Sequence, residues 1–402
     1  MKEDARLALE GLPWEYGDAA EMQRLSAKYA GADQGKVTRV FGANFIGRMS
    51  GKVVEAFVAK ADLLAASPAY SDQSGVDWKT AAASAAKVLN HIGGVDGMDP
   101  TGWTWYCNVD DIEKLSPTES PAEILWRGER AKSLSLEEDN FPPTLYGNGR
   151  INPTQNLVDA FPMLNGYPVS HLSGEYDENL PYANRDPRLE AYILYNGCKA
   201  GNTNKEIFTA ADGTTNDALN KVVGRSTRTG YYLRKLLRQD ISLDPNAKAD
   251  QYHYTPRIRY TEIFLAYAEA ANQAYGPQDK GGNGYSAYDV VKKLRHRAGI
   301  GRDNGDAYLE SIKNDQAKMA ELIRNERRIE LCFEGFRFWD LRRWKSNLTE
   351  TAKGMNISGT RYTPMEVDKR SFSEYMYYGP IPYSEVLKYD ELKQNQVGKP
   401  IV

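Results

Sequence analysis

The sequence predicts a mainly α-helical fold in which helix pairs form a scaffold around a loop-rich region that contains short β-strands. Apolar residues recur at helical spacing in residues 50–93 and again in residues 255–345. Residues 94–250, between these two regions, are rich in turn-forming residues and contain only short alternating segments. We therefore expect one domain over residues 1–402, which ends in an extended arm over residues 346–402.

The first helix pair is predicted in residues 50–93, after a helix end at residues 3–11 and a loop with at most one helix at residues 12–46. The first helix has an apolar face and ends at Ser67-Pro68; that face consists of Val54, Phe57, Val58, Ala61, Leu64 and Ala65. Asp77 caps the partner helix, which has mostly small residues on its apolar face. Two such helices form an αα-hairpin of the tetratricopeptide type.

Residues 94–122 form a loop with an unusual aromatic run. If this segment is extended, Trp103 and Trp105 point the same way, and with Tyr106 they form a platform for sugar rings or peptide side chains. The alternative is that the loop folds these aromatic side chains back onto the helices. We predict ligand contacts at Trp103, Trp105 and Tyr106, and also at Tyr146.

The sequence contains no clear metal or catalytic motif. Four aspartates of the same loop offer a calcium site as an alternative, but their spacing matches no regular calcium loop: Asp96, Asp99, Asp110 and Asp111. The histidines are isolated and the cysteines lack metal spacing: His91, His171, His253 and His296, and Cys107, Cys198 and Cys332. There is no GxSxG, HExxH, phosphate-loop or Rossmann motif. We therefore expect no metal or cofactor, and a binding protein is favoured over an enzyme.

The remaining elements follow from local signals. Short strands are expected in the loop-rich region at residues 123–131, 189–195 and 228–237. Thr255 and Pro256 suit the cap and first position of the helix that opens the second helical region. Ser286 and Asp289 form a capping box for its partner helix.

Residues 319–344 are the most informative stretch of the chain. Glu326 and Glu330 lie four residues apart on or beside an apolar helical stripe, where a carboxylate is costly unless it is paired. Arginines are available within the stretch, and further charged partners are expected from Arg259, Glu262, Glu269, Arg295 and Arg297. We interpret the pair as structural salt bridges and not as a two-carboxylate active site, because nearby cations lower the pKa that a general acid needs.

Composition limits the class of partner. The 402 residues include 51 basic and 54 acidic residues, for a net charge of −3, which argues against nucleic acid as a partner. No apolar stretch is long enough for a transmembrane helix, and the first residues lack the apolar core of a signal peptide.

Several segments, in order, resemble the SusD/RagB family of surface nutrient-binding lipoproteins of Bacteroidetes-type bacteria. The most specific is NERRIELCFEGFRFWDLRRW (325–344), which looks like the family's C-terminal signature. Other similar segments are GRMSGKVVEAFVAKADLLAASPAY (47–70), INPTQNLVDAFPMLNGYPV (151–169), RDPRLEAYILYNG (185–197) and YYGPIPYSEVLKYDELKQNQVG (377–398). The resemblance covers nearly the whole chain from about residue 3 and implies that the family's N-terminal part, with its lipid-modified cysteine, is absent from this sequence.

The resemblance implies a function and a set of structural residues. It implies a lipid-anchored protein of the outer-membrane surface that captures oligosaccharides and delivers them to a SusC-like TonB-dependent transporter without catalysis. Its signature residues in this chain are Glu326, Arg327, Glu330, Glu334, Arg337, Asp340 and Arg343. Three alternatives remain: a RagB-like protein that captures peptides, a generic tetratricopeptide scaffold that binds a protein segment, and a carbohydrate-active enzyme that uses Glu326, Glu330 or Glu334.

Overall fold

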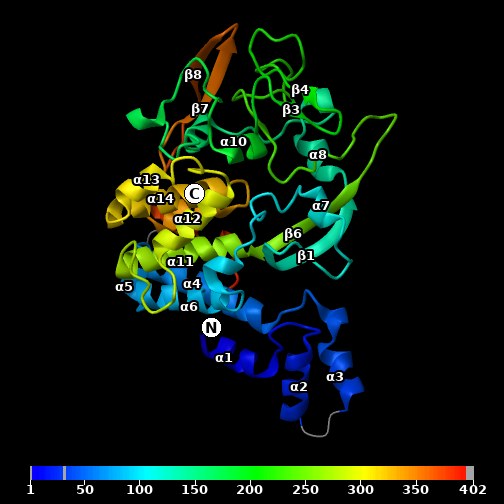
Figure 1. Ribbon diagram of the computed structural model, residues 1–402, viewed down its shortest axis with the longest axis vertical. Helices are drawn as coiled ribbons and strands as arrows, with labels where there is room; N and C mark the ends of the chain where they lie inside the picture. The colour runs from blue at the N-terminus through cyan, green and yellow to red at the C-terminus, as the bar shows by residue number, and fades with distance from the viewer. Residues whose placement is uncertain (1, 30–32, 395–402) are drawn as a thin grey trace.

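The computed structural model describes residues 2–29 and 33–394 and confirms a mainly helical fold. Figure 1 shows α1 (Lys2–Gly11), α2 (Ala19–Lys28) and α3 (Gln34–Phe41) at one end of the molecule and the loop-rich region at the other. The expectation of at most one helix in residues 12–46 is wrong, because α2 and α3 both form. Each begins at an aspartate whose side chain accepts a hydrogen bond from a backbone N–H of the first turn, Asp18 from Glu21 and Asp33 from Lys36, both at 2.8 Å.

The first predicted helix pair consists of α4 (Gly51–Ala66) and α6 (Trp78–Asn90), and Asp77 caps α6 as expected. The predicted apolar face of α4 is wrong. Phe57 and Leu64 are 40% and 42% exposed, whereas Ala56 and Ala59 on another face are fully buried. Small side chains let α4 and α6 approach closely, so the alanines and not the larger residues face the neighbouring helix.

The second helical region contains α11 (Tyr260–Tyr275), α12 (Ala287–Arg297), α13 (Ala307–Ile312), α14 (Gln316–Glu330) and α15 (Phe336–Arg343). The predicted capping box of Ser286 and Asp289 is confirmed at the start of α12. The helix start predicted at Thr255-Pro256 is wrong, because residues up to Arg259 pair in a strand. These helices and the first pair share one apolar core, in which α11 contacts α4, α6, α12 and α14.

The strands of the described residues form four antiparallel two-stranded ladders. They are β1 (Ile124–Ser133) with β6 (Gln251–Arg259), β2 (Ile193–Leu194) with β5 (Tyr232–Leu233), β3 (Lys199–Ala200) with β4 (Lys205–Glu206), and β7 (Ala352–Ser358) with β8 (Arg361–Asp368). The strand predicted at residues 189–195 is mostly wrong. Asp186 caps a short helix there, α10 (Pro187–Tyr192), which has proline at its first position.

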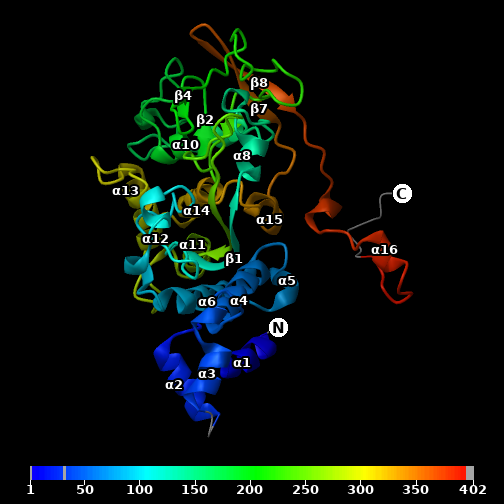
Figure 2. The same cartoon turned by 90° about the vertical axis from the view of Figure 1, so that its right-hand side faces the viewer.

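The C-terminal residues depart from the expected extended arm, because β7 and β8 form a hairpin within it. Beyond the hairpin, Tyr378 donates a hydrogen bond to the carbonyl oxygen of Ala69 at 2.7 Å, and the segment with α16 (Tyr383–Val386) then stands away from the body (Figure 2). Residues 395–402 of the predicted arm lie outside the described residues.

Short helices complete the described chain: α5 (Ser71–Ser74), α7 (Val109–Ile112), α8 (Ser135–Asn140) and α9 (Gln155–Val158), with 3-10 turns η1 (Ala43–Phe45), η2 (Gly94–Gly97), η3 (Pro143–Leu145), η4 (Leu172–Gly174) and η5 (Glu374–Tyr377). A second apolar core, rich in aromatic residues, lies under the loop-rich region and includes Trp105, Tyr106 and Tyr192. Among the described helices, none has the length and apolar character that crossing a bilayer requires.

Candidate functional site

A buried ion network lies where the helices meet the loop-rich region. Glu326 of α14 accepts hydrogen bonds from Arg188 of α10 at 2.8 Å and from Arg295 of α12 at 2.9 Å, and all three side chains are at most 1% exposed. The network extends to five cations and six carboxylates: Arg188, Lys235, Arg259, Arg295 and Arg297, with Glu123, Asp186, Asp306, Glu326, Glu330 and Glu334. The predicted role of Glu326 and Glu330 as structural ion-pair partners is thereby confirmed.

Glu330 is the central acceptor of this network. Its carboxylate oxygens lie 3.0 Å from Arg188 Nη1, 3.3 Å from Arg297 Nη2 and 3.9 Å from Arg259 Nη2. Burial by itself raises the pKa of Glu330, but the neighbouring positive charges outweigh burial and lower its pKa to about 2. For Glu326 and Glu334, too, burial raises the pKa, but the neighbouring positive charges outweigh burial and lower it.

A second ion group connects α14, α15 and α11. Asp340 accepts from Arg327 at 3.1 Å and from Arg343 at 2.8 Å, and Arg343 also donates to Glu269 at 2.6 Å. Six of the seven predicted signature residues therefore lie in ion pairs. The seventh, Arg337, forms no hydrogen bond or ion pair with the residues that the structure describes.

The first network holds together the loops that form a cavity. Arg295 Nη2 donates to the carbonyl oxygen of Gly166 at 2.8 Å and its Nε lies 2.5 Å from Asp306, so it joins two loops to α12. The same two loops also contact each other directly, because Gly301 N donates to the carbonyl oxygen of Leu164 at 3.0 Å. The buried side chain of Arg295 and this backbone hydrogen bond thus fix the positions of both loops.

We call this hollow the Trp103 cavity. Its volume is about 560 Å³, and it is lined by Trp103, Met163, Leu164, Asn165, Gly174, Glu175, Asn184, Pro187, Ala298, Gly299, Arg302, Asp303 and Asn304. The indole of Trp103 is partly buried, and its backbone carbonyl accepts a hydrogen bond from Tyr192 at 2.9 Å. A Cβ on Gly102, the residue before it, would lie 2.3 Å from Glu123 Oε2 and 2.8 Å from Arg297 Nη1, so a larger residue would displace these two members of the buried network. The buried network therefore also positions the indole.

Polar groups of the cavity are free to bind a ligand. The side chains of Glu175, Arg302 and Asp303 are exposed and form no hydrogen bond or ion pair with the described residues. Glu175 and Asn184 have φ angles of 58° and 52°, which non-glycine residues adopt rarely and which occur often at functional sites. An aromatic surface beside carboxylate, amide and guanidinium groups can contact the C–H face of a sugar and hydrogen-bond its hydroxyls.

The predicted platform of Trp103 and Trp105 is wrong. Residues 101–107 form consecutive turns, in which Thr104 N donates to Thr101 O and Cys107 N to Thr104 O, so the two indoles do not share a face. Trp105 and Tyr106 are only 4% and 5% exposed. The alternative, in which the loop folds its aromatic side chains inward, holds for these two residues, whereas Trp103 packs against the same core only in part and also lines the cavity.

Tyr146 is 49% exposed but does not line the Trp103 cavity. The aspartates considered for calcium also lie outside its lining. Asp99 and Asp111 both accept hydrogen bonds from Thr101, and no three His, Cys, Asp or Glu side chains in the described part of the chain are grouped to hold a metal ion. The residues that sequence reasoning missed, such as Asn184 and Arg302, carry no periodic or motif signal.

A sequence model of the SusD family matches residues 126–398. The chain belongs to the SusD family. Its similarity to individual members is low but extends over the fold. A SusD-like protein from Bacteroides fragilis has a solved structure with 25% identity and a TM-score of 0.68, covering 98% of this chain and 69% of that one. A second B. fragilis structure, of a SusD-like carbohydrate-binding protein, has 22% identity and a TM-score of 0.63, covering 91% of this chain and 68% of that one.

Two curated SusD-like proteins of Formosa agariphila match over shorter segments. SusD-like protein P38 is 33% identical over 85 residues, which are 21% of this chain and 16% of that protein. SusD-like protein P2 is 27% identical over 155 residues, which are 38% of this chain and 27% of that protein. The chain therefore spans less than a third of the length of either relative.

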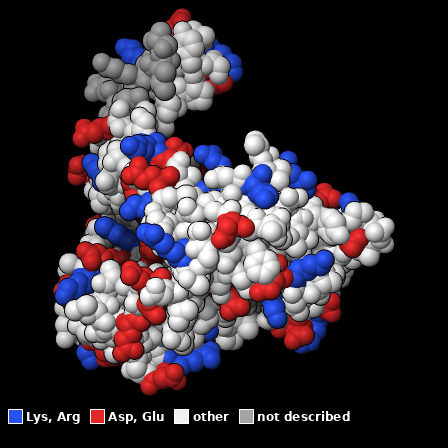
Figure 3. All heavy atoms as spheres, turned by 90° about the horizontal axis from the view of Figure 1, so that it is seen from above, with Lys and Arg blue, Asp and Glu red and all other residues white. Residues whose placement is uncertain are grey.

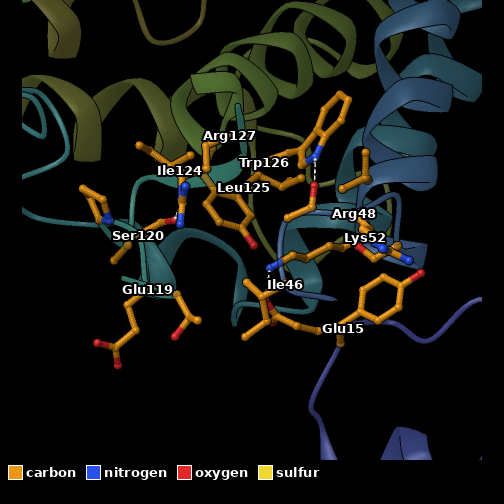
Figure 4. Close-up of a pocket in the computed structure, with 18 of the residues that line it drawn as sticks. Glu15, Ile46, Arg48, Lys52, Glu119, Ser120, Ile124, Leu125, Trp126 and Arg127 are labelled. Carbon is orange, nitrogen blue, oxygen red and sulfur yellow. Dashed lines mark hydrogen bonds and ion pairs between the residues drawn. The ribbon is translucent and has the colours of Figure 1, made fainter. Parts of the chain in front are cut away.

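Another hollow of this SusD-family chain, shown in Figure 4, has several of its polar groups engaged within the protein. Its volume is about 410 Å³, and it lies between the start of α4 and β1. Trp126 Nε1 donates to Gly47 O at 2.8 Å, Arg127 Nε donates to Ser120 Oγ at 2.8 Å, and Lys52 is paired with Glu15. These groups are engaged within the protein, and Arg48, which also lines the hollow, lies over the ring of Phe45 at 4.3 Å from its centroid. The Trp103 cavity is the stronger candidate because three of its charged side chains form no hydrogen bond or ion pair with the described residues.

The hypothesis of an active site at Glu326, Glu330 or Glu334 is not supported by their surroundings. Glu326 and Glu330 have no exposed surface, and the side chain of Glu334 is 9% exposed and paired with Arg259 and Lys235. A general acid needs a raised pKa and access to its substrate, and these carboxyls have a lowered pKa. In this structure these residues serve as partners of buried arginines.

Proposed function

We propose that this protein captures oligosaccharides at the cell surface and delivers them to a SusC-like TonB-dependent outer-membrane transporter, without catalysis. The observation that carries the proposal is the Trp103 cavity, where a partly buried indole lies beside polar side chains without partners among the described residues. The carbohydrate-binding description of the second B. fragilis protein supports the choice of ligand class.

Binding in this cavity is expected to be moderate. A sugar ring that covers half of the Trp103 indole buries about 100 Å² of apolar area, which contributes about 2–3 kcal/mol. Hydrogen bonds to Asp303, Arg302 or Asn184 add to this, while association costs several kcal/mol of translational and rotational freedom. The expected Kd is on the order of millimolar to micromolar, which permits transfer to a transporter.

The proposals for the cellular location and for the transporter partner are based on membership of the SusD family. We propose attachment to the outer membrane through a lipid anchor on a segment N-terminal to α1. The net charge of −3 and the mixture of acidic and basic residues over the face shown in Figure 3 favour neutral partners over nucleic acid.

Titration calorimetry against a panel of neutral oligosaccharides and short peptides tests the ligand class. Trp103→Ala is expected to weaken oligosaccharide binding about 30- to 150-fold, which corresponds to loss of the indole contact. Trp339→Ala is the matched control, because this tryptophan is 60% exposed on α15 and does not line the cavity.

The outcomes separate the proposals. Sugar binding that survives Trp103→Ala unchanged would move the site elsewhere. Saturable binding of peptides alone would favour the RagB-like alternative of peptide capture. Chromatography of the bound oligosaccharide after long incubation tests the absence of catalysis, since any shortened product would contradict it.

A further inference from the structure

Three arginines of the signature region line a hollow that the proposed glycan site does not use. Arg324 and Arg328 lie four residues apart on α14, and Arg337 lies near the start of α15. Both helices are labelled in Figure 2, and the ion pair of Arg327 on α14 with Asp340 on α15 joins them. The hollow has a volume of about 420 Å³, and we call it the arginine hollow.

The three guanidinium groups form no ion pair with a described carboxylate, although Glu350 attracts Arg328 and Arg337 at longer range. None of them forms a hydrogen bond or ion pair with the described residues; Arg324 only lies over the ring of Trp344, 5.2 Å from its centroid. All three side chains are partly buried. By contrast, Arg327 and Arg343 of the same stretch are ion-paired with Asp340.

The acidic groups near the hollow do not balance this charge. Glu321 and Glu350 also line it, and Glu350 already lies 3.8 Å from a further arginine, Arg370. Burial, followed by the positive charge of Arg328, lowers the pKa of Arg337 to about 10. Burial likewise lowers the pKa of Arg328. Partly desolvated, uncompensated cations of this kind are unfavourable in the absence of an anion.

We propose that the arginine hollow binds an oxyanion, namely a phosphate or sulfate group, either free or carried on a sugar. A guanidinium presents planar N–H donors in a fork that matches two oxygens of such a group, and two arginines from different helices approach a tetrahedral anion from different sides. Asn325, which also lines the hollow, donates to the carbonyl oxygen of Ala160 at 2.8 Å, so the arginines supply the principal donors.

The test uses inorganic phosphate and sulfate as probes, with chloride at matched ionic strength as the reference, and follows binding by calorimetry and thermal stability by Tm. Phosphate and sulfate are expected to bind saturably and to raise the Tm above its value in chloride. Arg328→Gln and Arg337→Gln are each expected to weaken binding at least tenfold. Arg337→Lys keeps the charge but loses the fork, and an intermediate affinity is expected.

Arg342→Gln is the matched control. Arg342 lies on α15 outside the hollow, and its Nε donates to the carbonyl oxygen of Met376 at 3.1 Å, so its loss should leave phosphate binding unchanged. In chloride, Arg337→Gln is expected to keep or raise the Tm, because it removes a repelling charge. A clear drop of its Tm in chloride would instead indicate a structural role for Arg337 and would overturn the proposal.

A sugar monophosphate and its unphosphorylated parent sugar distinguish the sources of the anion. Binding of the sugar phosphate together with inorganic phosphate, but not of the parent sugar, supports recognition of the anionic group itself. Failure of both phosphates and of sulfate to bind better than chloride would refute the site. Because Trp103 does not line this hollow, phosphate binding should persist in Trp103→Ala, so this test is independent of the proposed glycan site.

Discussion

Replacement of Glu330 by glutamine tests the central role of the buried network. The variant keeps the size of the side chain and removes its negative charge from among Arg188, Arg259 and Arg297. Loss of one member of a buried ion pair leaves uncompensated buried charge and typically costs about 3–5 kcal/mol. We therefore expect the free energy of unfolding of Glu330→Gln at pH 7 to fall by that amount.

The pH dependence of stability gives a second estimate of the contribution of Glu330 to the free energy of unfolding. The pKa of Glu330 is about 2 in the folded protein and 4.5 as an unperturbed side chain. Because the folded pKa is depressed, the carboxylate stabilises the fold above pH 4.5, and this contribution disappears as the pH falls through the folded pKa. Its full size is about 3 kcal/mol, of which about 2 kcal/mol is lost between pH 7 and pH 3.

Urea unfolding at pH 7 and at pH 3 measures both effects. The stability gap between wild type and Glu330→Gln should narrow by about 2 kcal/mol at the lower pH, because the wild type loses what the variant already lacks. Glu366→Gln is the control, since its carboxylate is 64% exposed and lies 3.8 Å from Lys369. Equal unfolding midpoints for Glu330→Gln and wild type at pH 7 would refute the reasoning.

Three further predictions concern packing, capping and thiols. Trp105→Ala should lower the free energy of unfolding by about 3–5 kcal/mol in urea titrations, because the indole fills the aromatic core; a loss below about 1 kcal/mol would contradict its burial. Ser286→Ala should cost about 1 kcal/mol in the same assay through loss of the α12 cap, and Ser286→Asp should restore it. The thiols of Cys107, Cys198 and Cys332 have pKa values raised to about 11 by burial, so a thiol reagent at pH 8 should label them only after unfolding, and rapid labelling of the native protein would be the opposite result.

Local sequence signals were sufficient to predict much of the helical scaffold. Apolar periodicity located α4, α6, α11, α12 and α14, and the caps at Asp77 and Ser286 were correct because capping is decided within four residues. Errors occurred where distant segments decide the structure. Thr255-Pro256 has the local form of a helix start, but the ladder of β6 with β1, about 130 residues earlier in the chain, keeps it extended.

The candidate site was predictable only in part, for a similar reason. The need of Glu326 and Glu330 for cationic partners follows from their position on an apolar stripe, yet Arg188 lies 138 residues from Glu326 and no local pattern connects the two. Trp103 was identified by its residue type, whereas the inward direction of Trp105 depends on turns in residues 101–107. Asn184 and Arg302 are exposed polar residues in loops, and only the folded chain shows that they share a cavity.

The ion network also connects folding with completion of the chain. Its five cations, Arg188, Lys235, Arg259, Arg295 and Arg297, all precede residue 326, as do three of its carboxylates, Glu123, Asp186 and Asp306. A nascent chain that does not yet include α14 thus carries more positive than negative charge at the positions that are buried in the folded protein. Burial of these unpaired positive charges is unfavourable. The earlier segments are therefore expected to stay open until Glu326, Glu330 and Glu334 have been synthesised.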